Sequence, residues 1–131
     1  FKDKDERVRA SAAAGVGEIG PTAKVAVPGL IGLLKDVDPE VRLNAAASLG
    51  SFGADAKAAD KSLIPLLKDR DEGVRGQVAE TLGKIDADPK LAVPALTTAL
   101  ADKHPGVRGD VAHALAKFKD AAKPAVPALT K

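Results

Sequence analysis

A Val-Arg pair returns every 33 residues along this chain, and this spacing constrains the fold more than any other feature. The pairs stand at Val8-Arg9, Val41-Arg42, Val74-Arg75 and Val107-Arg108, with no insertion or deletion between copies. A fixed period of about 20–50 residues is typical of repeat arrays, in which each copy is one supersecondary unit stacked on its neighbours. Such arrays usually present binding surfaces rather than single catalytic pockets.

Other positions recur in the same register. An aspartate lies six residues before each arginine of the pair, and an alanine lies four residues after it. The sequence therefore predicts one array over 1–131, with approximate repeats 3–35, 36–68, 69–101 and 102–131. Lysine and leucine each hold one further phase of the period, at Lys24, Lys57, Lys90 and Lys123 and at Leu30, Leu63, Leu96 and Leu129.

Neither terminus resembles the polar cap that closes natural solenoids. Phe1 shares its phase with leucines near the end of each repeat, and the chain has no initiating methionine. We therefore expect 1–131 to be a fragment of a longer solenoid, whose partner can also contact repeats outside it.

The composition fits a helical array and excludes several classes of protein. Hydrophobic residues make up 45% of the chain and aromatic residues only 2%, so the predicted core is built from alanine, valine and leucine. The chain contains no cysteine, which excludes disulfides and cysteine-ligated metal sites. No run reaches the ~18 apolar residues of a membrane-spanning helix. The net charge of +2 is too small to argue for a polyanion partner.

Each period is predicted to form two helices, the first of which is marked most clearly in the second copy. Asp38 fits the N-cap, with Pro39 and Glu40 in the first turn. Apolar residues then recur at helical spacing. Gly53 fits a left-handed position just after the helix.

The second helix is expected to begin near a proline, because proline is tolerated in a first helical turn and not in a helix interior. In the second copy Lys61 replaces that proline. There we expect a late start, with Ser62 as the cap and Pro65 in the first turn. The prolines of the other copies are Pro28, Pro94 and Pro127.

The stretch VPGLIGLLKDVDPEVRLNAAASLG, residues 27–50, resembles HEAT repeats and is similar to their short subclass named after phycobilisome chromophore lyases. The resemblance rests on the aspartate six residues before the arginine, the valine beside it, and the Ala-Ala and Leu-Gly that follow. It covers all four copies and implies an all-α fold, an α-solenoid of about four tandem helical hairpins. It also implies that the first helices lie outside and that the second helices line the concave side of a curved stack.

The aspartates and arginines of the period form the one polar set in the sequence with perfect periodicity. One interpretation is a row of guanidinium groups for an acidic ligand or a phosphate backbone. The other, which the family resemblance implies, is a structural ladder in which aspartates accept hydrogen bonds near helix starts and arginines clamp adjacent repeats. We favour the ladder because a joint must recur in every copy, whereas a binding site is expected to vary. Its predicted members are Asp3, Arg9, Asp36, Arg42, Asp69, Arg75, Asp102 and Arg108.

If Arg42 belongs to such a ladder, Arg42→Ala should destabilise the fold by about 1.5–3 kcal/mol, the range for a hydrogen bond to a charged partner. Chemical unfolding of the variant measures this loss. An unchanged unfolding midpoint would argue against the ladder.

Residues that carry chemistry are scarce. His104 and His113 are the two histidines, and their separation lies outside the four-residue spacing that places two metal ligands on one helix face. With so few histidines and no cysteine, no nucleophile and base set can be argued. No glycine-rich phosphate loop is visible. We therefore expect no catalytic residues, no cofactor and no metal.

The expected concave face carries small and mostly uncharged residues, which lack the Trp, Tyr and Arg side chains typical of binding hot spots. The lysine phase, joined by Lys35 and Lys68, is interpreted as a solvated face rather than a phosphate-tracking ridge. The predicted interaction face consists of Gly29, Gly32, Ser62, Pro65, Ala95 and Thr98.

The sequence thus favours a non-catalytic protein-interaction or scaffold module, whose partner is another protein or a neighbouring domain of the parent chain. The first alternative is an accessory part of an enzyme, such as a chromophore lyase subunit, which a bilin pulldown with a shift in visible absorbance would support. The second is a nucleic-acid-binding solenoid, which salt-dependent binding to duplex DNA would support.

Overall fold

The structure, a computed structural model, describes residues 27–118 together with Asp5. Within these residues every regular element is helical, either α or 3₁₀. This confirms the all-α fold that the period predicts. In chain order the elements are α2 (Val27–Leu33), α3 (Pro39–Ser51), the 3₁₀ helix η2 (Gly53–Ala59), α4 (Asp60–Leu63), the 3₁₀ helix η3 (Ile64–Lys68), α5 (Glu72–Lys84), α6 (Pro89–Ala99) and α7 (Pro105–Ala116).

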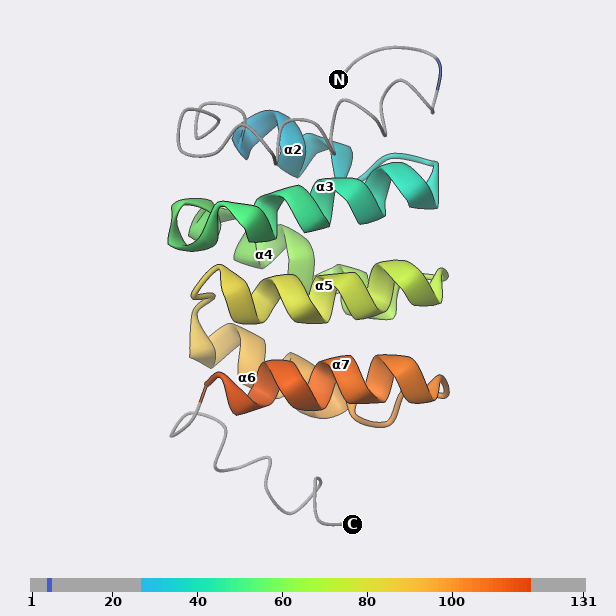
Figure 1. Cartoon of the computed structure of the whole chain (residues 1–131), viewed down its shortest axis with the longest axis vertical. Helices are drawn as coiled ribbons and strands as arrows, with labels where there is room; N and C mark the ends of the chain where they lie inside the picture. The colour runs from blue at the N-terminus through green and yellow to red at the C-terminus, as the bar shows by residue number, and fades with distance from the viewer. Residues whose placement is uncertain (1–4, 6–26, 119–131) are drawn as a thin grey trace.

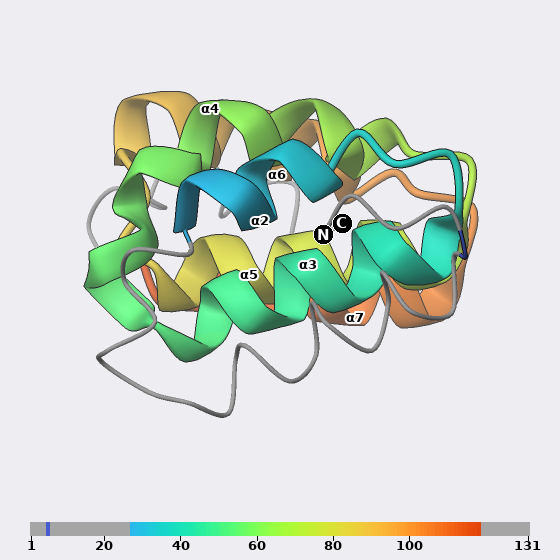
Figure 2. The same ribbon diagram turned by 90° about the horizontal axis from the view of Figure 1, so that it is seen from above.

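The helices form two layers of an elongated stack. The first helices of the repeats, α3, α5 and α7, lie side by side with α5 in the middle (Figure 1). Seen from above, α2, α4 and α6 form the second layer beside them (Figure 2). Each hairpin therefore packs on the next one, which is the arrangement of an α-solenoid.

The first helices begin where the sequence predicts, because a polar side chain caps each of them. The Asp38 carboxylate accepts hydrogen bonds from the backbone N–H groups of Glu40, at 2.8 Å, and Val41, at 3.4 Å. Asp71 accepts one from Val74 at 3.0 Å, and Nδ1 of His104 accepts one from Gly106 at 3.2 Å. The histidine thus takes the place of the aspartate without losing the cap.

The core lies between the two layers and between successive repeats. Its side chains are almost all alanine, valine, leucine and isoleucine. Small residues allow α3 and α5 to approach closely, and both Ala46 and Ala79 are fully buried. Thr81 is the buried polar residue at this junction, and its hydroxyl donates to the carbonyl oxygen of Ala46 at 2.8 Å. Repeats are therefore joined by burial that no single hairpin achieves.

The start of α6 corrects the prediction for the third copy. This helix begins at Pro89, where Asp88 accepts a hydrogen bond from the Lys90 N–H at 3.0 Å, and Pro94 lies in its interior. The Asp88 cap and Pro89 in the first turn fix the earlier start. Pro94 is exposed, as is Lys90, whose carbonyl oxygen would pair with the N–H that proline lacks. Water can therefore replace the missing donor.

The second copy also departs from the prediction. Its α-helix begins early, at Asp60, so Ser62 lies inside α4 and does not cap it. Lys61 does not restrict the residue before it as a proline would, so Asp60 adopts the helical conformation, with φ −54° and ψ −47°. Pro65 then falls in the first turn of η3, where the chain changes to a 3₁₀ helix. Of the prolines in the phase of Lys61, Pro28 lies in the first turn of α2, and Pro127 lies outside the described residues.

Gly53 has a φ of +57°, the left-handed conformation predicted for it, and Asp86 has the same φ one period later. We expect Gly53→Ala to lower the free energy of unfolding by about 1 kcal/mol, because a Cβ strains this conformation. Gly109→Ala should act in the opposite direction, raising stability by about 0.5–1 kcal/mol, because Gly109 is an exposed residue inside α7 with nothing within 4 Å of an added Cβ. Urea unfolding of both variants measures the two signs. Two changes of the same sign would contradict this account.

Candidate functional site

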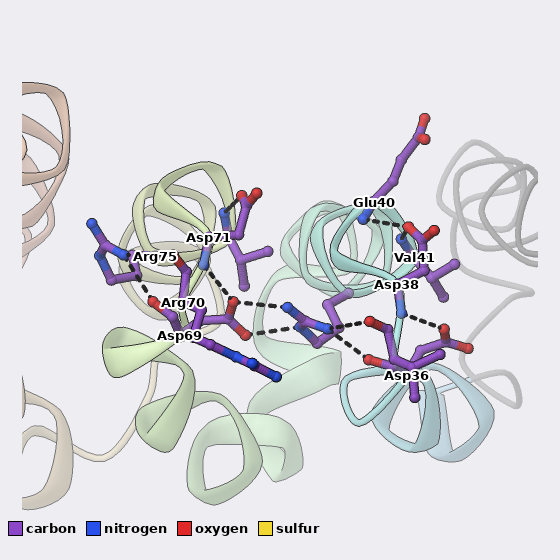
Figure 3. Close-up of polar contacts among 11 residues, drawn as sticks. Asp36, Asp38, Glu40, Val41, Asp69, Arg70, Asp71 and Arg75 are labelled. Carbon is purple, nitrogen blue, oxygen red and sulfur yellow. Dashed lines mark hydrogen bonds and ion pairs between the residues drawn. The ribbon is translucent and has the colours of Figure 1, made fainter.

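The periodic arginines and aspartates meet between repeats rather than within them. Arg42 donates through Nε to Oδ2 of Asp69 at 2.8 Å and through Nη2 to Oδ1 at 2.9 Å (Figure 3). Arg75 repeats this fork on Asp102, at 2.7 and 3.2 Å. Each pair joins residues 27 apart, so the arginine of one copy holds the aspartate of the next.

The remaining guanidinium nitrogen of each arginine is bonded within its own copy. Nη1 of Arg42 donates to the carbonyl oxygens of Asp36, at 2.8 Å, and Val37, at 3.1 Å. Nη1 of Arg75 donates in the same way to Asp69, at 2.8 Å, and Arg70, at 3.3 Å. The aspartate six residues before the arginine therefore contributes its backbone to that arginine.

The aspartate side chains also shape the loops that precede the first helices. Oδ1 of Asp36, Asp69 and Asp102 accepts the N–H two residues on, at 2.9 Å in each case. In the last described copy, Arg108 is exposed and its Nη1 donates to the carbonyl oxygen of Asp102 at 2.8 Å. Among the described residues no carboxylate pairs with Arg108. Asp3 and Arg9 lie outside the described residues.

Burial and hydrogen bonding act in opposite directions on the ladder carboxylates. Burial by itself would raise the pKa of Asp69, but hydrogen bonds from Arg42 and from the amide of Asp71 outweigh it and hold the pKa below 3.8, the ordinary value. The pKa of Asp102 is lowered against the same effect of burial by Arg75 and by the amide of His104. Both carboxylates are therefore ionised and paired at neutral pH.

This pairing predicts that the free energy of unfolding decreases in acid. Because the pKa of Asp69 is lower in the folded chain than in the unfolded chain, its contribution is complete above pH 3.8 and is lost as the pH falls through the folded value. Asp69→Asn should therefore be less stable than the parent at neutral pH, and the difference should narrow below pH 3.8. Urea unfolding from about pH 7 to about pH 2 measures this. Asp55→Asn, at an exposed aspartate of η2, is the control, and a gap that stays constant in acid would contradict the assignment.

The residues of the predicted interaction face all lie in the second layer. Gly29 and Gly32 are on α2 and are exposed, and Ser62 on α4 is half-buried. The remaining three lie closer together. Pro65 of η3 and Thr98 of α6 are exposed, Ala95 of α6 is half-buried, and all three line one groove.

This apolar groove has a volume of about 580 Å³ and lies between two adjacent repeats. Ile64, Pro65 and Leu67 of η3 line it together with Ala95, Thr98 and Ala99 of α6. Ala95, Thr98 and Ala99 are spaced as one face of a helix. Lys68, Ala101 and the ladder residues Asp69, Arg75 and Asp102 complete the lining.

The sequence-based selection missed two small residues that line this groove. Ala99 stands in the phase of Leu33 and Leu66, and Ala101 stands in the phase of Lys35 and Lys68. Two long side chains of the other copies are thus replaced by methyl groups at one place. The signal was present in the sequence as a break in the period, but it has meaning only once the two positions are known to face the same space.

Asp60 is a second residue that the period did not reveal. It is buried, and its carboxylate accepts hydrogen bonds from the N–H of Lys61 at 2.7 Å and from the N–H of Asp88, in the next repeat, at 3.3 Å. It therefore ties the second layer together as the arginines tie the first. Residue 27 of the chain is valine and residue 93 is valine in the same phase, so Asp60 is particular to the second copy.

Over the part of the chain that the structure describes, no group of three or more acidic, histidine or cysteine side chains is placed to hold a metal ion. Nε2 of His104 lies 3.6 Å from Oε2 of Glu72, and His113 is exposed. Of the lysine phase, Lys57 and Lys90 are exposed, and Lys24 and Lys123 lie outside the described residues. No helix within the described residues is long and apolar enough to span a membrane.

Comparison with known proteins agrees with this geometry. The profile of HEAT repeats matches residues 1–61, 27–93 and 61–131, which together span the chain. The chain belongs to the HEAT-repeat family. The match is to HEAT repeats in general, so the similarity to the phycobilisome lyase subclass stays a prediction.

The fold is also similar to that of a solved structure. The HEAT-repeat chain is similar to an engineered protein whose crystal structure was determined by a structural genomics consortium, with a TM-score of 0.76 and 25% sequence identity. The similarity covers 95% of this chain and 64% of that one. No curated protein matches the chain closely enough to count as a relative.

Proposed function

We propose that this HEAT-repeat array is a non-catalytic protein-interaction module, and that the apolar groove between η3 and α6 is its binding site. The observation that carries the proposal is the groove of about 580 Å³ in whose lining Ala99 and Ala101 stand where other copies carry leucine and lysine. The equivalent joint one repeat earlier keeps Leu66 and Lys68, and its groove of about 470 Å³ is lined mostly by charged residues, so the apolar character is particular to the joint with the two alanines.

The hydrogen bonds of the ladder arginines support the same proposal. Nε and Nη1 of Arg42 and Arg75 are all used in hydrogen bonds within the stack, and Nη2 of each completes the fork on an aspartate. These guanidinium groups are therefore engaged in joining repeats, and the Asp and Arg set remains our candidate for a structural ladder. In the groove beside it, Ala99 and Ala101 differ from the leucine and lysine of the other copies.

Selection of peptides from a random displayed library on the immobilised chain tests the proposal. We expect enriched peptides whose affinity, measured by calorimetry, falls about tenfold or more in Ala101→Lys, since this variant restores the lysine of the other copies and narrows the groove. Ala58→Lys makes the same substitution at an exposed site on η2 and should leave the affinity within about twofold. Peptides that bind Ala101→Lys as tightly as the parent would place recognition elsewhere on the array.

A further inference from the structure

A second groove lies directly beside the apolar one and differs from it in charge. This basic groove has a volume of about 470 Å³ and shares Lys68 and Asp69 with the apolar groove. Its other charged lining residues include Lys35 and Arg70. The side chains of Lys35, Lys68 and Arg70 are all exposed, so they can meet a partner in solution.

The basic groove has more unpaired positive charge than the apolar groove. Four basic side chains line the basic groove (Lys35, Arg42, Lys68 and Arg70) and two acidic ones (Asp36 and Asp69). Arg42 and Asp69 neutralise one another through their fork. In the apolar groove Arg75 is paired with Asp102, and Asp69 is the same carboxylate that Arg42 neutralises, so Lys68 is the charge that remains in a lining that is otherwise mostly apolar. One surface therefore offers an apolar slot followed by a positive one.

The spacing of the two grooves sets the length of a ligand that fills both. They occupy equivalent places in successive repeats, since most positions that line the basic groove line the apolar groove one period later. Packed helices lie about 8–10 Å apart, and an extended chain advances about 3.3 Å per residue. A bound segment thus needs about three residues to pass from one groove to the next.

We propose that the two grooves together bind an extended peptide that carries an aliphatic side chain about three residues from a pair of acidic residues. The aliphatic side chain enters the apolar groove between η3 and α6, where Ala99 leaves room for it. The acidic residues lie over Lys35, Lys68 and Arg70. This inference rests on the proposed function and adds the chemistry of the partner.

An extended polyanion such as duplex DNA is the competing occupant, and the apolar groove argues against it. A phosphate backbone gains from a continuous row of cations. Here the phase of Lys35 and Lys68 is interrupted, because Ala101 replaces its next lysine, and Lys103, in the phase of Arg70, does not line the apolar groove. The lining of that groove includes Ile64, Pro65 and Leu67.

Fluorescence anisotropy with labelled, end-blocked octapeptides tests the proposal on the whole chain. The probe peptide carries Glu-Glu three residues from a leucine, and its comparisons carry Lys-Lys for the acidic pair or alanine for the leucine. We expect each comparison peptide to bind at least about tenfold more weakly than the probe. Raising the salt concentration should lower the affinity for the probe and should not lower the affinity for the Lys-Lys peptide.

Two variants of the chain locate the probe. Ala99→Leu restores the leucine of the other copies and fills the apolar slot, and Lys35→Glu/Arg70→Glu reverses the positive one. Each variant should lower the affinity for the probe peptide about tenfold. Lys57→Glu/Lys90→Glu changes the net charge equally outside both grooves, and its affinity for the probe should stay within about twofold of the parent. Thermal unfolding checks that the variants fold, and Ala101→Lys replaces Ala99→Leu if that variant does not.

The proposal is overturned if the Lys-Lys peptide binds as tightly as the probe, if filling the groove has no effect, or if the control double variant weakens binding equally. It is also overturned if a 20-base-pair duplex displaces the probe and itself responds to Lys35→Glu/Arg70→Glu but not to Ala99→Leu. Library peptides without acidic residues that still depend on Ala101 would overturn this inference and leave the proposed function intact. The absence of any groove-dependent peptide would overturn both.

Discussion

Arg75→Ala is expected to lower the free energy of unfolding by about 3 kcal/mol, in the lower part of the range for breaking a buried ion pair by removal of one partner. Arg75 and Asp102 keep only 9% and 8% of their side-chain surface exposed, so the substitution leaves a carboxylate with little access to water. It also removes the donor to the carbonyl oxygens of Asp69 and Arg70. The loss should exceed that of Arg42→Ala, whose guanidinium is more exposed, at 14%.

Urea unfolding followed by circular dichroism measures this change, and the chain supplies its own control. Arg108 stands in the phase of Arg75 one copy later. It is exposed, and among the described residues it is hydrogen-bonded through one nitrogen only. Arg108→Ala should change stability by no more than about 0.5 kcal/mol, as at an ordinary surface site. Equal losses in the two variants would show that the arginines act within their own loops rather than between repeats.

The first helices were predictable because their signals are local and repeat. Asp38 with Pro39 marks a helix start by chemistry alone, and the apolar residues that follow show the helical period. The residue types of the ladder were equally visible. The family resemblance implied that the arginines clamp adjacent repeats, but it did not name their partners, and the period alone leaves open whether Arg42 meets Asp36, six residues away, or Asp69 in the next copy. Stacking decides this, because it places the next repeat's loop against the guanidinium.

The second helices were predicted less well because tertiary contacts override the local signal there. The preference of proline for the first helical turn predicted that α6 starts near Pro94. Asp88 instead caps a helix that starts five residues earlier, at Pro89, and Pro94 is tolerated inside the helix because it lies on the exposed side. In the second copy the buried Asp60, at the start of α4, accepts a hydrogen bond from the neighbouring repeat, which no local pattern reports. The apolar groove could not be predicted either, because only the structure shows that Ala99 and Ala101 line the same groove.

The largest effect on stability is expected from a cavity in the central repeat. Leu82 of α5 is fully buried, and α5 packs against both α3 and α7. Leu82→Ala removes side-chain atoms that surrounding helices cannot readily replace, and such substitutions cost about 2–5 kcal/mol. We expect a value near the upper end, about 4 kcal/mol, because Leu82 is fully buried in a helix that packs between two other first helices.

Two leucines of the same chain make the comparison specific. Leu91→Ala removes the same atoms from a side chain that is 37% exposed and should cost less than about 1 kcal/mol. Leu115, in the phase of Leu82 one copy later, is also fully buried, but its helix α7 packs on one described first helix only. In an array held by nearest-neighbour interfaces, Leu115→Ala should loosen the last described repeat before the rest, whereas Leu82→Ala should uncouple the stack at its centre. Hydrogen exchange resolves the two patterns: Leu115→Ala should raise exchange mainly in α7, and Leu82→Ala should raise it in α3, α5 and α7 together. A uniform rise in both variants would mean that the described repeats unfold as one cooperative unit and that stability is not carried interface by interface.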